Sequence, residues 1–145
     1  MVKHRAVLAI LGIPMSLNDI MEVKVTEVMT KPLPDVRKKG ALALRGLGEI
    51  MQALKWADCV ALGPGLGQHF ETVELVRRLV TRIELSMVID ADGLNAISKD
   101  SSILNQAKAP LILTDHRALH HILHRAAHAR QRVCRFVRLL VCPAL

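Results

Sequence analysis

Along residues 5–115, short apolar runs alternate with amphipathic stretches, a rhythm typical of βαβ units. In segment 71–83, Val73, Val76 and Val80 recur at helical spacing on one face, which predicts a helix. The compact apolar runs predict strands over residues 7–13, 26–29, 58–62, 86–89 and 110–114. Further helices are predicted over residues 17–25 and 42–56, and another begins with residues 94–98. Such alternation predicts an α/β fold with a parallel sheet, whose ligands bind at the carboxyl ends of the strands.

The pattern changes after residue 115. Apolar positions between residues 118 and 140 are compatible with one basic amphipathic helix. Up to Asp115 the chain has 14 basic and 13 acidic residues, whereas six arginines and no acidic residue follow it. The formal net charge of +7 therefore belongs almost entirely to this segment. We predict two regions, a domain at residues 1–115 and a basic tail at residues 116–145.

The composition favours a cytoplasmic protein. The sequence has no run of about 18 apolar residues, so we predict no membrane span. The first apolar stretch is too short for a signal peptide, lacks a small-residue cleavage site and is interrupted by Pro14. Three cysteines without metal-site spacing are interpreted as reduced thiols: Cys59, Cys134 and Cys142.

A glycine-rich turn follows the predicted strand at residues 58–62. It reads Gly63, Pro64, Gly65, Leu66 and Gly67. Glycines let backbone N–H groups approach an oxyanion, and the following helix presents its positive N-terminal end. The turn is neither the dinucleotide pattern G-x-G-x-x-G nor a Walker loop, because no Lys-Ser/Thr follows. A ligand-binding turn and an ordinary βα connection both remain open.

Acidic residues end the next predicted strand. Asp90 and Asp92 follow it directly, and Asn95 comes three residues later. Carboxylates at this position can bind Mg²⁺ through water, hold a ribose hydroxyl or act as a base. Asp92 is better placed as the N-cap of the helix that starts near Leu94, and capping leaves Asp90 unexplained. We therefore predict that Asp92 caps the helix and that Asp90 is the stronger functional candidate.

Histidines are concentrated after the last predicted strand. His116 would lie at the same edge of the sheet, where it could donate to a carbonyl or phosphate or remain a half-exposed loop residue. Four more histidines are spaced as on a helix: His120, His121, His124 and His128. No acidic or cysteine partner accompanies them, so we predict no metal site.

Together these segments resemble the ADP/ATP-dependent NAD(P)H-hydrate dehydratases of the ribokinase-like superfamily. The most specific part is the Gly-Pro-Gly-Leu-Gly turn at residues 63–67, followed by Asp-Ala-Asp-Gly-Leu-Asn at residues 90–95. The resemblance extends over residues 5–115. The other matching segments are Leu11 to Pro14, Thr26 to Thr30, Pro32 to Pro34, Ala57 to Leu62, Val88 and Ile89, and Leu111 to Thr114.

The resemblance implies a three-layer αβα sandwich, truncated here at both ends. It implies an enzyme that repairs hydrated NADH or NADPH, whose nicotinamide ring has taken up water. ATP or ADP, with Mg²⁺, would supply the phosphoryl group that makes the ring hydroxyl a leaving group. The family's substrate contacts map onto Gly63, Gly65, Gly67 and His116. The family often assembles into oligomers, so a homo-oligomer is expected.

The departures from the family pattern concern catalysis. Where the family reads Thr-Pro-His-Pro-Gly-Glu, only Thr114 and His116 match. No glycine follows Gly93, so the family's Lys-Gly segment and its Gly-Thr-Gly-Asp motif, which supplies the catalytic aspartate, are missing. We therefore assign no catalytic residue and predict no turnover by this chain alone. A change of reading frame near codon 115 would explain the altered tail, and a natural basic tail is the other interpretation.

Two alternative functions remain open at this point. The first is a small-molecule kinase of the same superfold, acting on a vitamin precursor, although the Gly-Pro-Gly-Leu-Gly turn argues against it. The second is a non-catalytic module whose basic tail binds nucleic acid. Nucleic acid is the less favoured partner, because Phe136 is the tail's one aromatic residue and base stacking has little support.

Overall fold

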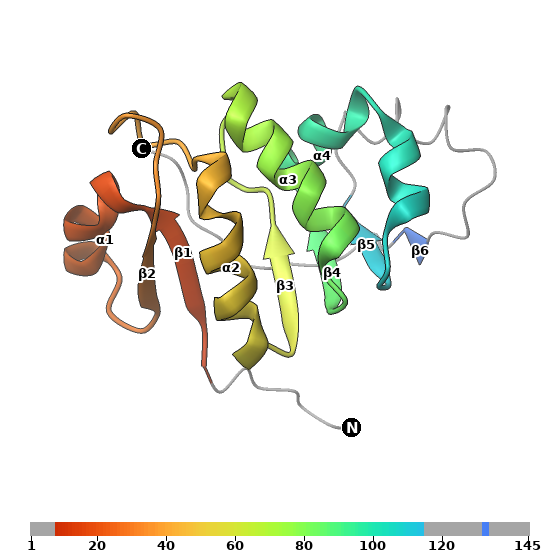
Figure 1. Ribbon diagram of the computed structural model, residues 1–145. Coiled ribbons are helices and arrows are strands. Elements are labelled where there is room, and N and C mark those ends of the chain that lie inside the picture. The colour runs from red at the N-terminus through yellow and green to blue at the C-terminus, as the bar shows by residue number, and fades with distance from the viewer. Residues whose placement is uncertain (1–7, 115–131, 134–145) are drawn as a thin grey trace.

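The computed structural model describes residues 8–114 and 132–133, which form an α/β fold with two parallel sheets (Figure 1). The smaller sheet pairs β1 (Ile10–Pro14) with β2 (Met29–Leu33). The larger sheet has the order β3-β4-β5-β6, and every neighbouring pair is parallel. Its strands are β3 (Cys59–Leu62), β4 (Ser86–Ile89), β5 (Leu111–Leu113) and β6 (Arg132–Val133). The predicted α/β class with parallel strands is confirmed.

Helices occupy the connections between these strands. The α-helices are α1 (Asn18–Lys24), α2 (Leu47–Ala53), α3 (Phe70–Arg82) and α4 (Ala91–Ser98). Short 3-10 helices are η1 (Met15–Leu17), η2 (Leu44–Gly46), η3 (Leu54–Trp56) and η4 (Ser101–Gln106). Helix α3 links β3 to the parallel strand β4, which is the βαβ unit expected from the sequence.

The hydrophobic core lies between α3 and the larger sheet. Leu75, Val76, Leu79 and Val80 of α3 are all buried, since their spacing places them on one helical face. Val76 and Val80 pack with the buried residues of β4, β5, α4 and η4, whereas Leu75 and Leu79 pack toward β2 and α2. Burying each of these side chains stabilises the fold by roughly 1.5–3 kcal/mol. This face of α3 therefore packs into both core clusters.

One face of the larger sheet is covered by α2 and α3. Figure 1 shows α2 and α3 in front of this sheet. Met87 and Ile89 of β4 point to this face because they are two residues apart, and both are fully buried. Val88, between them, is only partly buried and points to the opposite face. Within residues 8–114 and 132–133, the structure thus shows one helical layer of the expected three-layer sandwich on this sheet.

The second predicted strand is displaced along the chain. It was expected at residues 26–29, before the prolines, but β2 covers Met29–Leu33 and includes Pro32, which pairs with Ile13. Within the described residues β2 pairs only with β1, so its other edge is open. An edge strand tolerates a proline because the missing N–H can lie on the unpaired side. The prediction that the prolines end the strand was wrong for this reason.

The predicted helix of the basic tail is wrong at two residues. Arg132 and Val133 form β6, which pairs in parallel with Ile112 and Leu113 of β5. Their backbone groups join a sheet ladder and cannot belong to a continuous helix over residues 118–140. The remaining residues of that prediction lie outside the part of the chain that the structure describes.

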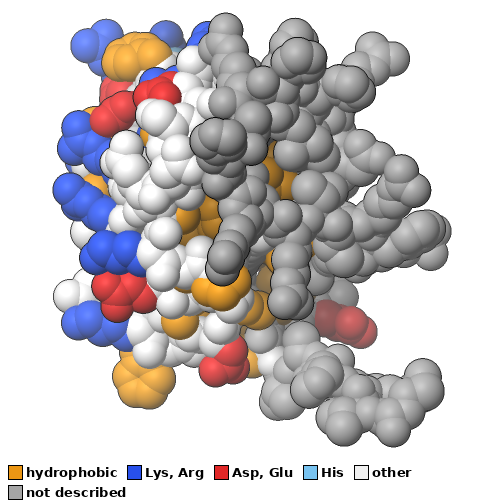
Figure 2. Space-filling view, turned by 90° about the vertical axis from the view of Figure 1, so that its right-hand side faces the viewer, with side chains coloured by type: hydrophobic (Ala, Val, Ile, Leu, Met, Phe, Trp, Pro, Cys, Tyr) orange, Lys and Arg blue, Asp and Glu red, His pale blue; other side chains and the backbone are white. Residues whose placement is uncertain are grey.

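The described surface mixes basic and acidic side chains. Figure 2 shows lysine and arginine side chains along one margin of the molecule, with acidic and hydrophobic side chains between them. Two ion pairs account for part of this mixture, Arg78 with Glu74 at 2.7 Å and Lys108 with Glu84 at 3.1 Å. In the described residues, no helix is long and apolar enough to cross a membrane.

Candidate functional site

The carboxyl ends of β3, β4 and β5 bring three sequence segments together. The register places Leu62, Ile89 and Leu113 side by side, so the residues that follow them meet at one edge. Two backbone hydrogen bonds extend the ladder past the strands: Asp90 N–H donates to Leu62 O at 3.0 Å, and Thr114 N–H donates to Ile89 O at 3.2 Å. The glycine turn, the acidic segment and Thr114 are therefore neighbours, as the parallel sheet predicts.

The glycine turn is held against the acidic segment at a distance that excludes side chains. Gly63, Gly65 and Gly67 have φ angles of 138°, 71° and 70°. A Cβ added to Gly63 would lie 1.8 Å from the carbonyl oxygen of Asp90, and one added to Gly93 would lie 2.8 Å from the carbonyl oxygen of Leu62. The two glycines therefore let the turn and the start of α4 approach each other. The contribution of Gly93 was not predicted from the sequence.

Asp90, and not Asp92, is the N-cap of α4. Its carboxylate accepts a hydrogen bond from Ala91 N–H at 2.8 Å and another from the hydroxyl of Thr114. The helix starts at Ala91, three residues before the predicted start near Leu94. The prediction that Asp92 caps the helix and leaves Asp90 free was therefore wrong. Asp90 instead fixes the end of β5 to the start of α4.

Asp92 joins the acidic segment to the glycine turn. Its carboxylate accepts hydrogen bonds from Gly67 N–H at 2.9 Å and from the Gln68 amide at 3.0 Å. The Asn95 amide donates to the same carboxylate at 3.3 Å. The structure thus brings together Asp92, Asn95 and Gly67, three of the predicted site residues. Gln68 was missed by the sequence argument, although its position directly after the turn was a usable signal.

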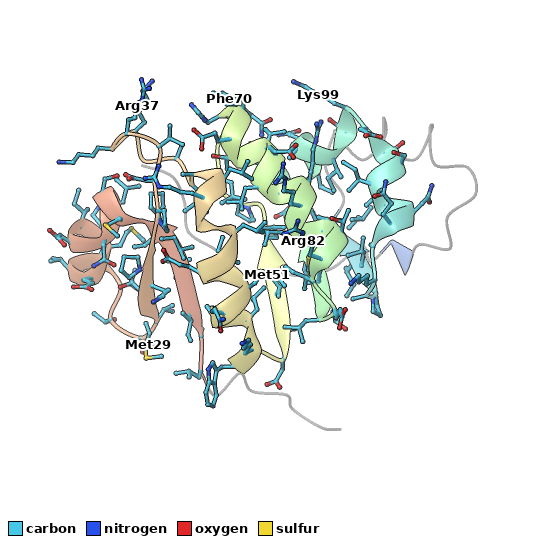
Figure 3. All side chains as sticks on the ribbon, in the orientation of Figure 1. Met29, Arg37, Met51, Phe70, Arg82 and Lys99 are labelled. Carbon is cyan, nitrogen blue, oxygen red and sulfur yellow. The ribbon has the colours of Figure 1, made fainter. Side chains whose placement is uncertain are left out.

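The start of α3 lies at the same end of the molecule, where Figure 3 labels Arg37, Phe70 and Lys99. His69 caps α3, since its Nδ1 accepts a hydrogen bond from Glu71 N–H at 3.3 Å. Glu71 in turn accepts from Leu44 N–H at 3.1 Å, so its carboxylate is also engaged within the protein. Phe70 remains 75% exposed, and its ring centroid lies 4.6 Å from that of the His69 ring. His69 and Phe70 were not anticipated as residues of this edge.

These contacts limit what the edge can bind. Gly67 N–H, one of the expected anion donors, is taken by Asp92. Gly65 is exposed, and its N–H has no acceptor in the part of the chain that the structure describes. The turn therefore offers a ligand oxygen the N–H of Gly65, whereas the carboxylates of Asp90 and Asp92 already accept hydrogen bonds from the protein.

The described residues do not fit a directly bound Mg²⁺. They contain no group of three or more His, Cys, Asp or Glu residues able to hold a metal ion. The carboxylates of Asp90 and Asp92 are already hydrogen-bonded to protein donors. His116 and the four histidines of the tail lie outside the described residues, so the predictions made for them stay predictions.

The chain is an α/β domain with a parallel sheet, and its glycine turn and paired aspartates lie at the carboxyl edge, where such domains bind their ligands. Residues 8–140 match the sequence profile of the NAD(P)H-hydrate dehydratases, and the chain belongs to this family. The match confirms the resemblance drawn from the motifs. It extends through most of the basic tail, and the boundary at residue 115 stays a prediction.

Curated relatives of the chain are named as NAD(P)H-hydrate repair enzymes. The chain is 38% identical over 114 residues to a bifunctional NAD(P)H-hydrate repair enzyme of Moorella thermoacetica, covering 79% of this chain and 21% of that protein. It is 35% identical over 104 residues to the Salinibacter ruber enzyme of the same name, covering 71% of this chain and 19% of that protein. It is 34% identical over 101 residues to the Thermofilum pendens enzyme of the same name, covering 70% of this chain and 19% of that protein. The chain spans about a fifth of the length of these relatives.

Proposed function

We propose that this chain binds hydrated NADH or NADPH and contributes the substrate-contacting part of a nucleotide-dependent dehydratase. The observation that carries the proposal is the junction of the glycine turn and the acidic segment, made by Asp92 and Gly67 at the edge where parallel sheets bind ligands. Membership of the dehydratase family and the names of the relatives support the same substrate class. A cytoplasmic location and assembly into a homo-oligomer belong to the proposal as predictions from the sequence.

The described residues have distinct roles in this proposal. The N–H of Gly65 donates to a substrate oxygen, and the exposed ring of Phe70 provides a flat apolar surface for a base or a nicotinamide ring. Asp90 and Asp92 hold the loops that form the edge. His116 remains a proposed substrate contact from the family resemblance.

Phosphoryl transfer is not assigned to any residue of the chain. In the proposed reaction, ATP or ADP phosphorylates the ring hydroxyl of the hydrate, and elimination of phosphate restores the dihydronicotinamide. The sequence has no glycine after Gly93, so it lacks the family's glycine-containing nucleotide motif. The aspartates of the described edge are hydrogen-bonded within the protein, and we derive no step through Mg²⁺. We expect binding of the hydrate without turnover.

The proposal is tested with the purified 145-residue chain. Calorimetric titration measures its affinity for hydrated NADPH, and absorbance of the dihydronicotinamide measures recovery of NADPH after addition of ADP or ATP. The test variant is Gly65→Ala, which adds a side chain at a φ of 71° beside the N–H that has no acceptor in the described residues. Gly48→Ala is the matched control, because an added Cβ there has no atom within 4 Å.

The expected result is binding of the hydrate that Gly65→Ala weakens and Gly48→Ala leaves unchanged, with no recovery of NADPH. Absence of binding, or equal binding by both variants, would contradict the assignment of the turn. Recovery of NADPH that depends on ADP or ATP would show that the missing motif is dispensable and would refute the expected lack of turnover.

A further inference from the structure

We propose that Asp92 is a positioning residue that fixes the glycine turn and determines which backbone N–H a ligand can reach. This inference rests on the proposed function for the identity of the ligand. The contacts themselves are independent of that function, because they join the glycine turn to the start of α4 within the chain. Neither the family match nor the names of the relatives assign this role to Asp92.

Most hydrogen bonds of Asp92 come from Gly67 and Gln68, at the C-terminal end of the glycine turn. Asp92 lies in the first turn of α4 and reaches Gly67, 25 residues earlier in the chain, at 2.9 Å. Gln68 donates both to the Asp92 carboxylate at 3.0 Å and to the Asp92 carbonyl at 3.4 Å. Asn95 donates from the next turn of the same helix. One carboxylate thus receives donors from the segment of the glycine turn and from its own helix.

In the described residues, Gly67 and Gln68 are exposed, and a Cβ built on Gly67 has no atom within 4 Å. The earlier part of the turn is held by packing, because Gly63 is buried against the carbonyl of Asp90 and Leu66 packs against both core clusters. The carbonyl of Gly63 also accepts a hydrogen bond from Leu66 N–H at 3.2 Å. Asp92 therefore supplies the hydrogen bonds that hold Gly67 and Gln68 within the described part of the chain.

The position of Asp92 has a consequence for ligand recognition. Its carboxylate occupies Gly67 N–H, while Gly65 N–H has no acceptor within the described residues. All donors to Asp92 are uncharged, and in the described part of the chain it forms no ion pair, so its role rests on accepting these hydrogen bonds. The N–H of Gly67 is thereby withdrawn from a ligand. A ligand oxygen is directed to Gly65.

The experiment uses three variants of the full chain. Asp92→Ala removes all the contacts, whereas Asp92→Asn keeps an amide oxygen that can accept from Gly67 N–H without the charge. Asp58→Asn is the charge-matched control, since Asp58 is exposed before β3 and has no hydrogen bond or ion pair in the described region. Hydrogen exchange of the Gly67 amide, followed by NMR, and the affinity for NADPH, followed by calorimetry, are measured for each.

We expect Asp92→Ala to accelerate exchange of the Gly67 amide about ten-fold, the factor typical for loss of one hydrogen bond, and to weaken NADPH binding by a similar factor. Asp92→Asn should restore most of both, and Asp58→Asn should change neither. This rescue by the uncharged variant separates positioning from a general loss of stability, which circular dichroism of each variant also monitors.

Three results would overturn the proposal. Unchanged Gly67 exchange in Asp92→Ala would show that the contact does not fix the turn. Faster exchange with equal or tighter NADPH binding would show that Asp92 only competes with the ligand. Failure of Asp92→Asn to rescue, in a folded variant, would show that the charge and not the geometry matters. If the wild type binds neither hydrated NADPH nor NADPH but its Gly67 exchange depends on Asp92, the proposed function fails while the fixed turn is supported.

Discussion

Replacement of Gly63 by alanine tests the closest approach in the candidate site. The added Cβ would lie 1.8 Å from the carbonyl oxygen of Asp90 and 2.9 Å from the backbone nitrogen of Gly93. Both neighbours are backbone atoms, so no side-chain rotation can relieve the contact. The φ angle of 138° adds a conformational cost for any residue with a side chain. The variant folds only if the turn and the start of α4 move apart.

The magnitude follows from two separate costs. Holding a non-glycine residue in a sparsely populated backbone region costs about 1–3 kcal/mol. Overpacking in a closely packed interior typically costs about 1–3 kcal/mol, and more where the backbone itself must shift. We therefore expect Gly63→Ala to lower the free energy of unfolding by about 4 kcal/mol or more, a large share of the roughly 5–15 kcal/mol of an ordinary domain.

Two other glycines provide an internal scale. Gly67→Ala meets no atom within 4 Å but keeps a φ of 70°, so a loss of about 1–2 kcal/mol is expected from the backbone alone. Gly48→Ala, in α2, has open space and no positive φ, so a gain of about 0.5–1 kcal/mol is expected from helix propensity. Urea unfolding followed by circular dichroism measures all three free energies. A Gly63→Ala variant within about 1 kcal/mol of the wild type would refute the close approach.

Other contacts give further expected outcomes. Leu79→Ala, at a position 2% exposed in the core, should lower the free energy of unfolding by about 2–5 kcal/mol in the same urea assay. Thr114→Val removes the hydroxyl that donates to Asp90 and should cost about 1–3 kcal/mol with little change of shape; an unchanged midpoint would argue against this bond. The hydroxyl of Ser102, followed by its backbone N–H, lowers the pKa of Asp100. Asp100 therefore stabilises the fold above its ordinary pKa and loses this effect on acidification, so the deficit of Asp100→Asn in thermal unfolding should shrink as the pH falls.

The periodicity of apolar residues was sufficient to predict those elements that bury a single face. The helix expected at residues 71–83 is α3 at Phe70–Arg82, because its apolar positions form a single stripe against the sheet. The strand expected at residues 86–89 has the same limits in the structure. These elements needed no knowledge of their neighbours, since a periodic apolar pattern already specifies which face is buried.

The remaining differences depend on tertiary contacts that local patterns do not contain. Pro32 was expected to end a strand, yet β2 tolerates it because β2 pairs on one side only within the described residues. Asp92 was predicted to cap the helix because it lies two residues before Leu94, near which the helix was expected to start. The helix starts earlier because Asp90 is held by the ladder bond from its own N–H to Leu62 and by the hydroxyl of Thr114.

The exchanged roles of Asp90 and Asp92 change the chemistry expected at the edge. A free Asp90 would have been available as a base or a metal ligand, but its carboxylate is engaged by Ala91 and Thr114. Asp92, once interpreted as a cap, instead controls the turn through Gly67. Both aspartates therefore act on the protein's own loops, and the groups left for a ligand are backbone N–H groups and the exposed ring of Phe70. Such an edge suits binding and orientation of a nucleotide better than proton transfer, as the proposed function requires.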